Sequence, residues 1–349
     1  MIFLSERSRK GSGSRYTRLN NLYDGKSNIV MNNTDSPNPN KQIASSIVRA
    51  MTGEDILSVL RMQTGDQNFV YAVKTSVAEY ILRMTDRNNK HKFHAAIEWQ
   101  KMLLPLGIPL AEFIKSDLDS ECSSYPALLM RRLPGDDLIN VYPDISNADK
   151  KNLADEMVNI QSLCISLPEG PGYGIHDSYE PAKTEKTWYE FIIKRLELCK
   201  KHITKAALFD RNLAKQVLNI AKEREESFRI VRPTPFLWDA SERNVLVYKG
   251  KISGIVDVDD ICFGDPLLVI ALTSTCLELE GFDTVYTDHW AATLNLDKAA
   301  QGRLNFYRLF YSIAFMRKQA MKTANSKRVI FNTERLLNIF HRSLERLNQ

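Results

Sequence analysis

The chain has 349 residues, which exceeds the usual size of a single domain and predicts either one large two-lobed unit or two domains. Hydrophobic residues make up 44% and charged residues 26%, as in ordinary globular proteins. No run of about 18 apolar residues occurs, so we expect no membrane partner.

The formal charge of +5 is concentrated at the N-terminus. Residues 1–41 hold seven basic and three acidic side chains, so the rest of the chain carries only about +1. A nucleic-acid partner would require a basic surface on the folded part, and we expect none. The same 41 residues are rich in Ser, Asn, Gly and Pro and show no apolar periodicity, which predicts a disordered basic tail.

The cysteines indicate the compartment. There are five, an odd number, and none of them forms a CxxC pair. This spacing favours neither a disulfide framework nor a zinc site, and it predicts a reducing, cytoplasmic location.

Residues 42–133 show the pattern of a small sheet with helices. An amphipathic helix over KQIASSIVRAM precedes three strands, ILSVLRMQ, NFVYAVKTS and AEYILRM. A turn containing Gly65 and Asn68 separates the first two strands. The segment KFHAAIEWQKMLLPLG predicts a helix that carries Glu98. A further strand, in YPALLMRRL, is broken by Pro134 and Gly135.

Residues 134–349 are mainly helical by the same criteria. Apolar side chains recur at helical spacing in several long segments, and no internal repeat is visible. The predicted helices cover residues 147–164, 186–203, 209–228, 267–279, 303–321 and 334–347.

The segment from residue 236 to 272 carries the strongest chemical signal. Asp239 precedes Asn244 by five positions, and Asp257 follows Asn244 by thirteen. Two β-branched strands, VLVY and ISGIV, lie between the last two residues and predict a hairpin with Asn244 and Asp257 at neighbouring strand ends. Oxygen ligands so placed suit Mg²⁺, and Asp239 would lie close enough to take a proton from a hydroxyl. The alternative is that all three are ordinary loop residues.

This segment resembles the aminoglycoside phosphotransferase family, small-molecule kinases with a protein-kinase-like fold. LWDASERN corresponds to the family's HGDxxxxN loop, and IVDVDDICFGDP to its ViDwedaxxGDP segment. The resemblance implies an α+β, two-lobed fold, with a small antiparallel-sheet N-lobe over 42–133 and a larger, mainly helical C-lobe over 134–349. It also implies transfer of the γ-phosphate of ATP or GTP, with Mg²⁺, to a hydroxyl of a small molecule such as an aminoglycoside, sugar or amino alcohol.

The resemblance further implies roles for residues of the N-lobe. The turn with Gly65 and Asn68 would cover the nucleotide phosphates. Arg83 would reach the α- and β-phosphates and form an ion pair with Glu98. The side chain of Met130 would line the adenine pocket. The peptide groups of Arg131 and Leu133 would pair with the adenine edge.

Two positions depart from the family motif. Leu237 stands where the family has a His, so we expect apolar packing, with Trp238, to hold the loop. Ser241 stands where relatives often have a basic residue, and Arg243 is the candidate for supplying that charge. These departures favour one alternative function, a catalytically inactive nucleotide-binding regulatory protein on the same scaffold.

Overall fold

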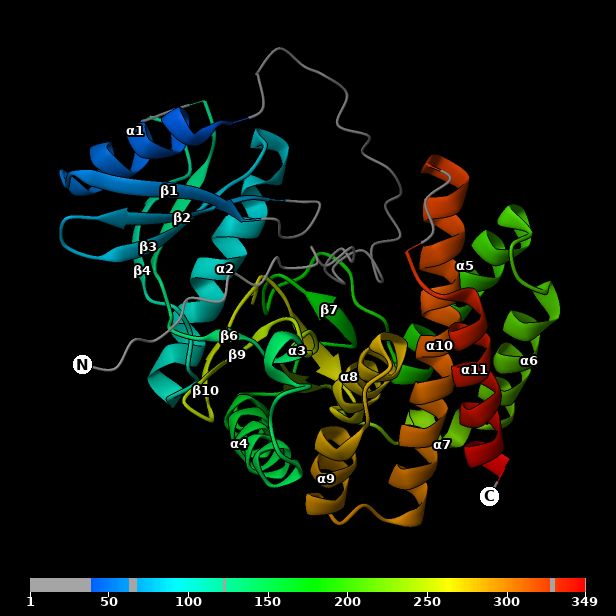
Figure 1. The fold of residues 1–349 in the computed structure, drawn as a ribbon. Helices are drawn as coiled ribbons and strands as arrows, with labels where there is room; N and C mark the ends of the chain where they lie inside the picture. The colour runs from blue at the N-terminus through cyan, green and yellow to red at the C-terminus, as the bar shows by residue number, and fades with distance from the viewer. Residues whose placement is uncertain (1–38, 63–67, 122–123, 327–329, 349) are drawn as a thin grey trace.

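Five antiparallel strands near the N-terminus form a sheet with a helix against each face (Figure 1). The computed structural model describes residues 39–62, 68–121, 124–326 and 330–348. The elements of this region are α1 (Lys41–Thr52), β1 (Ile56–Met62), β2 (Phe69–Thr75), β3 (Glu79–Met84), α2 (Lys90–Leu103), β4 (Phe113–Asp117) and β5 (Ala127–Arg131). The strand order is β1-β2-β3-β5-β4, and short 3₁₀ turns flank α2 on both sides.

The alternation of side chains along β3 decides which residue faces the rest of the protein. Leu82 and Met84 pack with Ile47 of α1 in one buried cluster. Because successive side chains of a strand point to opposite faces, Arg83 projects to the other face. There its guanidinium carbon lies 5.2 Å from the ring centroid of Phe93, on α2. The sheet thus buries a cation on the face that it shares with α2.

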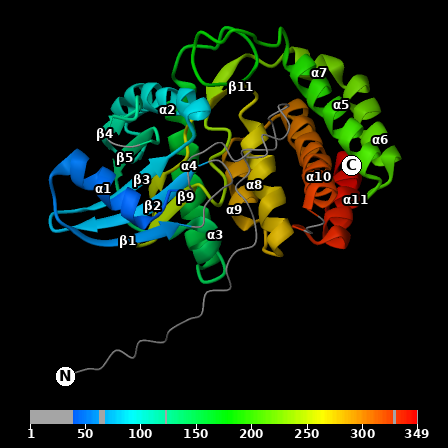
Figure 2. The same cartoon turned by 90° about the horizontal axis from the view of Figure 1, so that it is seen from above.

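The larger region that follows is mainly helical. Its helices are α3 (Leu138–Val141), α4 (Asn147–Ile165), α5 (Trp188–Ala206), α6 (Arg211–Glu223), α7 (Glu225–Arg229), α8 (Leu267–Glu280), α9 (Val285–Thr293), α10 (Lys298–Ser326) and α11 (Thr333–Asn348). α10 packs against α5, α8 and α11, and α4 packs against α9. Seen from above, the sheet lies on one side, α5, α6, α10 and α11 lie on the other, and α4 and α8 lie between them (Figure 2).

Two small sheets lie between these two parts. Their strands are β6 (Asp136–Asp137), β7 (Gly174–His176), β8 (Thr234–Phe236), β9 (Val245–Tyr248), β10 (Lys251–Ile255) and β11 (Ile261–Gly264). One sheet has the order β10-β9-β6 and the other β7-β11-β8. The loops that join the strands of these two small sheets contain the candidate catalytic residues: Asp239 and Asn244 lie between β8 and β9, and Asp257 lies between β10 and β11.

The predicted α+β fold is confirmed, with an antiparallel sheet in the first part and mostly helices in the second. The predicted strands and long helices are present, including the hairpin of β9 and β10. The sequence interpretation missed the short strands β4, β6, β7, β8 and β11 and the helices α3 and α9. The helix predicted over residues 209–228 is divided into α6 and α7. Of the predicted tail, residues 1–38 lie outside the described part of the chain, and α1 already begins at Lys41.

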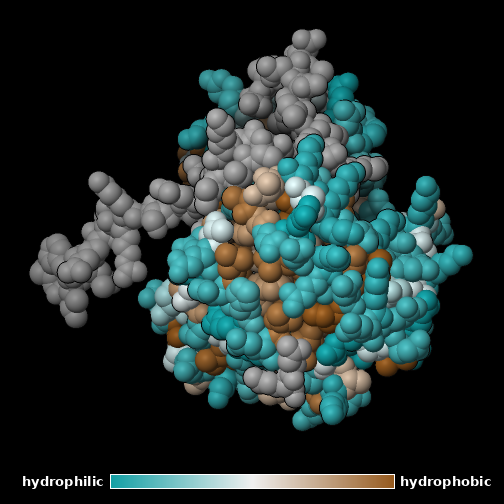
Figure 3. Space-filling view, turned by 90° about the vertical axis from the view of Figure 1, so that its right-hand side faces the viewer, coloured by the Kyte–Doolittle hydropathy of each residue, from teal (hydrophilic) through white to brown (hydrophobic). Residues whose placement is uncertain are grey.

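The helical face that carries α5, α6 and α11 is mostly hydrophilic, with apolar side chains gathered in its middle (Figure 3). Within the part of the chain that the structure describes, no helix is both long enough and apolar enough to cross a membrane.

Gly135 lies where the chain enters the helical region, and it tests how tightly this junction is packed. Its φ is +107°, and a Cβ there would lie 2.3 Å from the carbonyl oxygen of Val247. Because backbone strain and the clash add, we expect Gly135→Ala to lower the free energy of unfolding by about 2–3 kcal/mol. Gly250→Ala is the matched control, since its φ is +76° but no atom lies within 4 Å of the added Cβ.

We expect the Gly250→Ala control to cost only about 1 kcal/mol, from the left-handed backbone alone. Urea unfolding followed by circular dichroism measures both variants. Equal losses for the two would contradict the close approach at Gly135.

Candidate active site

A cleft between the sheet and the helical region has a volume of about 260 Å³. Its lining comes from β3, β5, the connection that follows β5, and the segment after β10. Six residues singled out from the sequence for nucleotide or metal binding meet there: Asn68, Arg83, Met130, Arg131, Leu133 and Asp257. Gly65 falls outside the described residues. Positions far apart in the sequence thus line one cleft.

The connection after β5 forms one wall of this cleft by packing on the β9–β10 hairpin. Leu133 lies so close to Gly254 that an added Cβ would be 2.2 Å from the Leu133 Cδ1. The N–H of Arg131 donates to the carbonyl oxygen of Glu112 at 2.9 Å. The N–H of Arg131 is therefore engaged within the sheet.

The loop that carries Asp239 begins directly after β8 and is held by its own backbone. The side-chain Nδ2 of Asn244 donates to the carbonyl oxygen of Asp239 at 2.9 Å, and the N–H of Asn244 donates to the carbonyl of Ser241 at 3.0 Å. The N–H of Ile139, in α3, donates to the carbonyl of Glu242 at 2.8 Å. Asp239 is 8% exposed. The loop is therefore fixed before any ligand binds.

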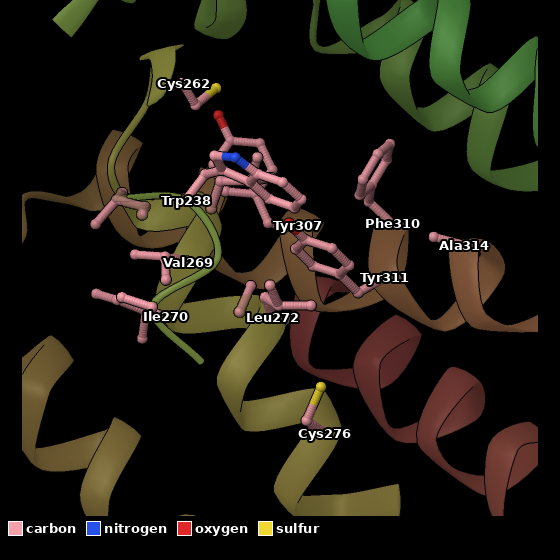
Figure 4. Close-up of a cluster of buried hydrophobic side chains, with 14 of the residues drawn as sticks. Trp238, Cys262, Val269, Ile270, Leu272, Cys276, Tyr307, Phe310, Tyr311 and Ala314 are labelled. Carbon is pink, nitrogen blue, oxygen red and sulfur yellow. The ribbon is translucent and has the colours of Figure 1, made fainter. Parts of the chain in front are cut away.

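The residue before Asp239 anchors the loop in the main core. Trp238 is 4% exposed and belongs to a buried cluster with Cys262, Leu272, Tyr307 and side chains of α8 and α10 (Figure 4). Burial of an indole removes a large apolar surface from water, which strongly favours one position of the chain. The predicted role of Trp238 in apolar packing next to the loop agrees with this arrangement.

Asn244 and Asp257 lie at adjoining strand ends, as the spacing predicts. Val245 pairs with Ile255 in the hairpin, and the N–H of Val256 donates to the carbonyl of Asn244 at 2.9 Å. Asp257 has a φ of +63°, a left-handed conformation that costs a non-glycine residue about 1 kcal/mol or more and is concentrated at functional sites. Within the described residues, the buried Oδ1 of Asn244 accepts no hydrogen bond. A buried amide oxygen in this state is suited to a cation.

Arg83 is bound by carboxylates of the segment that follows β10. Its Nη1 and Nη2 donate to the two oxygens of Asp259 at 2.8 and 2.5 Å, and Nη2 also donates to Asp257 at 3.2 Å. Burial alone would lower the pKa of Arg83, but Asp259 and Asp257 raise it above its usual value. The two-pronged contact with Asp259 fixes the plane of the guanidinium as well as its position.

The predicted ion pair between Arg83 and Glu98 is wrong. Glu98 lies on the solvent side of α2 and pairs with Lys101 at 2.7 Å, with 63% of its side chain exposed. The helix presents Phe93 to Arg83 instead. Glu98 lies five positions after Phe93, and this spacing places them on different faces of a helix. Asp259 takes the place that the sequence interpretation gave to Glu98.

Arg243, the candidate for supplying the basic charge of the loop, binds a carboxylate of α8. Its Nη2 donates to Glu280 at 2.5 Å, and its Nε lies 3.5 Å from Glu242. Burial raises the pKa of Glu242 to about 7, because Arg243 and a hydrogen bond from Cys276 only partly offset the loss of water. These contacts tie the loop to α8.

The sheet, the helical region and the cleft between them define a protein-kinase-like fold of the kind found in small-molecule kinases. The profile of the phosphotransferase enzyme family, APH, matches residues 61–304. The chain therefore belongs to that family.

Several solved structures share this fold. A thermostable mutant of aminoglycoside phosphotransferase APH(4)-Ia, in a ternary complex with ADP and hygromycin B, is 16% identical, with 87% of this chain and 97% of that chain covered and a TM-score of 0.61. A putative fructosamine-3-kinase from Haemophilus somnus is 14% identical (87% and 96% covered, TM-score 0.58). Choline kinase LicA from Streptococcus pneumoniae is 13% identical (88% and 98% covered, TM-score 0.58). A search of curated proteins gave no significant match.

Proposed function

We propose that the protein transfers the γ-phosphate of ATP or GTP to a hydroxyl group of a small molecule. The observation that carries this proposal is the cleft, where the cation Arg83 and the carboxylate of Asp257 meet the wall formed by Met130 and Leu133. A nucleotide with its base against that wall would extend its phosphates toward Arg83. The APH family assignment and the nucleotide in the ternary complex of a structural neighbour support the same donor.

Asp239 is the proposed base. The side chain of Asn244 donates to the backbone of Asp239, and Trp238 anchors the preceding position, so Asp239 lies beside one of the two residues assigned to the metal. A carboxylate there would orient the acceptor hydroxyl and accept its proton as the phosphoryl group is transferred. Most of the remaining rate enhancement would come from positioning and from neutralisation of the phosphate charge.

Asn244 and Asp257 are the proposed ligands of Mg²⁺. Both offer the hard oxygen atoms that this ion prefers, and the amide oxygen of Asn244 is buried without a hydrogen bond among the described residues. In the same part of the chain, no group of three His, Cys, Asp or Glu could hold a metal ion. Two protein ligands are typical of Mg²⁺ sites that complete their shell with phosphates and water, and the bound ion would neutralise phosphate charge.

The acceptor is proposed only as a class, a small hydroxylated molecule. The names of the structural neighbours include a complex with hygromycin B, a putative fructosamine-3-kinase and a choline kinase, and each of these names concerns a small molecule. The fold supports the reaction and leaves the acceptor to be found by experiment.

A transfer screen tests this proposal. The full chain is incubated with Mg²⁺ and ATP or GTP and a panel of aminoglycosides, ketosamines, sugars and amino alcohols, and the products are analysed by mass spectrometry. We expect at least one acceptor to gain one phosphate, and the gain to disappear with EDTA. Mg²⁺-dependent nucleotide binding without transfer to any acceptor would instead support the inactive nucleotide-binding protein.

A further inference from the structure

A buried glutamine of α4 is hydrogen-bonded to the backbone just before the catalytic loop. The Nε2 of Gln161 donates to the carbonyl oxygen of Leu237 at 3.0 Å, and the N–H of Leu237 donates to the Oε1 of Gln161 at 3.1 Å. Gln161 is 4% exposed and Leu237 2% exposed. One side-chain amide therefore satisfies both polar groups of one residue, as a neighbouring strand does in an antiparallel sheet.

The bonded residue, Leu237, lies two positions before Asp239. Leu237 follows β8, which pairs with β11 on one side. The carbonyl of Leu237 also accepts the N–H of Ala240 at 3.3 Å, which closes the turn that contains Asp239. If the Leu237 peptide shifted, the amide of Gln161 and the backbone of Leu237 would lose their buried partners together, so the bonds oppose such a shift.

The same helix also holds the hairpin that carries the proposed metal ligands. Five residues before Gln161, the carboxylate of Glu156 accepts the N–H of Ile252, in β10, at 2.7 Å. α4 packs against both β8 and β10. One helix thus bonds to the residue that follows β8, two positions before Asp239, and to β10, the strand that leads to Asp257.

Leu237 occupies the position where the family motif has a His, so its own side chain cannot form a hydrogen bond that orders the loop. We propose that Gln161 is a positioning residue, whose amide fixes the Leu237 peptide and thereby the place of Asp239. This inference rests on the function proposed above. In this role Gln161 makes no contact with substrate. It only fixes where Asp239 lies relative to Asn244 and Asp257, and phosphoryl transfer is sensitive to that geometry.

The test compares two buried glutamines. Gln161→Met keeps the length and most of the volume of the side chain but removes both hydrogen bonds. Gln319→Met is the matched control, because the Oε1 of Gln319 accepts the N–H groups of Ile330 and Phe331 before α11 and the residue is also fully buried. If the methionine variant does not fold, Gln161→Asn keeps the amide on a shorter side chain that cannot form both bonds.

Two readouts separate positioning from stability. We expect Gln161→Met to lower kcat about 10- to 100-fold and to change the nucleotide Kd less than twofold. We expect Gln319→Met to lower Tm by about as much as Gln161→Met does, while its kcat stays within twofold of wild type. Hydrogen–deuterium exchange should become faster over residues 234–244 only in the Gln161 variant. Equal kcat and equal exchange in the two variants would overturn the inference.

Exchange also separates this inference from the proposed reaction. If the wild-type chain transfers phosphate to no acceptor, the proposed function fails. The positioning role is then judged by hydrogen–deuterium exchange alone. Faster exchange over residues 234–244 in Gln161→Met supports the positioning role of Gln161, and unchanged exchange refutes it.

Discussion

Asp239→Asn should lower turnover by about 10²–10⁴-fold while nucleotide affinity stays within about twofold, because a general base contributes this much and makes no contact with the nucleotide in the proposed arrangement. The substitution keeps the shape of the side chain, and the hydrogen bond from Asn244 goes to the Asp239 backbone, so the loop should keep its structure. Steady-state kinetics with the acceptor found by the screen, together with calorimetric titration of nucleotide and Mg²⁺, measures both quantities.

Glu242→Gln is the control for this prediction, in the same loop. Burial raises the pKa of Glu242 to about 7, so at neutral pH a neutral amide removes less than a full unit of charge. We expect turnover within about threefold of wild type. If Asp239→Asn were as active as Glu242→Gln, Asp239 could not be the base.

Asp259→Asn should lower kcat/KM for the nucleotide by roughly 10- to 100-fold, since a hydrogen bond to a buried charged group is worth about 1.5–3 kcal/mol. The two carboxylate bonds to Arg83 fix the guanidinium, and an amide can accept only through one oxygen. Without Asp259, Arg83 would be drawn toward Asp257, the proposed metal ligand. Initial rates at varied nucleotide concentration give the change.

Glu98→Gln is the matched comparison for this second prediction. Its exposed pair with Lys101 is worth less than about 1 kcal/mol, and we expect kcat/KM within twofold of wild type. The reverse ranking, with a larger loss in Glu98→Gln than in Asp259→Asn, would restore the ion pair predicted from the sequence.

The residues that lie close together in the sequence were the easiest to place. Asp239, Asn244 and Asp257 fall within one loop and one hairpin, whose strands have a clear β-branched pattern, and the structure brings the last two to adjoining strand ends. The long helices were equally predictable, because their apolar spacing persists over several turns. Strands of two or three residues, such as β6 and β7, carry too few side chains to show an alternation.

Partners that come from distant segments could not be predicted in this way. Arg83 lies 176 positions from Asp259, and Gln161 lies 76 positions from Leu237. No periodicity relates such residues, and the pairing of Arg83 with Glu98 was predicted from the family resemblance alone. The partner of Arg83 depends on the rotation of α2 about its axis, which turns Phe93 toward Arg83 and Glu98 toward solvent. The sequence pattern predicts that α2 is amphipathic, but it does not determine which of its side chains faces Arg83.

Phosphorus NMR of the full chain with a nucleoside triphosphate, Mg²⁺ and the acceptor panel tests the proposed reaction most directly. We predict that nucleoside diphosphate and a new phosphate monoester accumulate in equal amounts, and that Asp239→Asn produces neither at a comparable rate. Nucleoside diphosphate accompanied only by inorganic phosphate, with no monoester from any acceptor, would contradict the proposed reaction. No consumption of a nucleotide that binds with Mg²⁺ would contradict it as well.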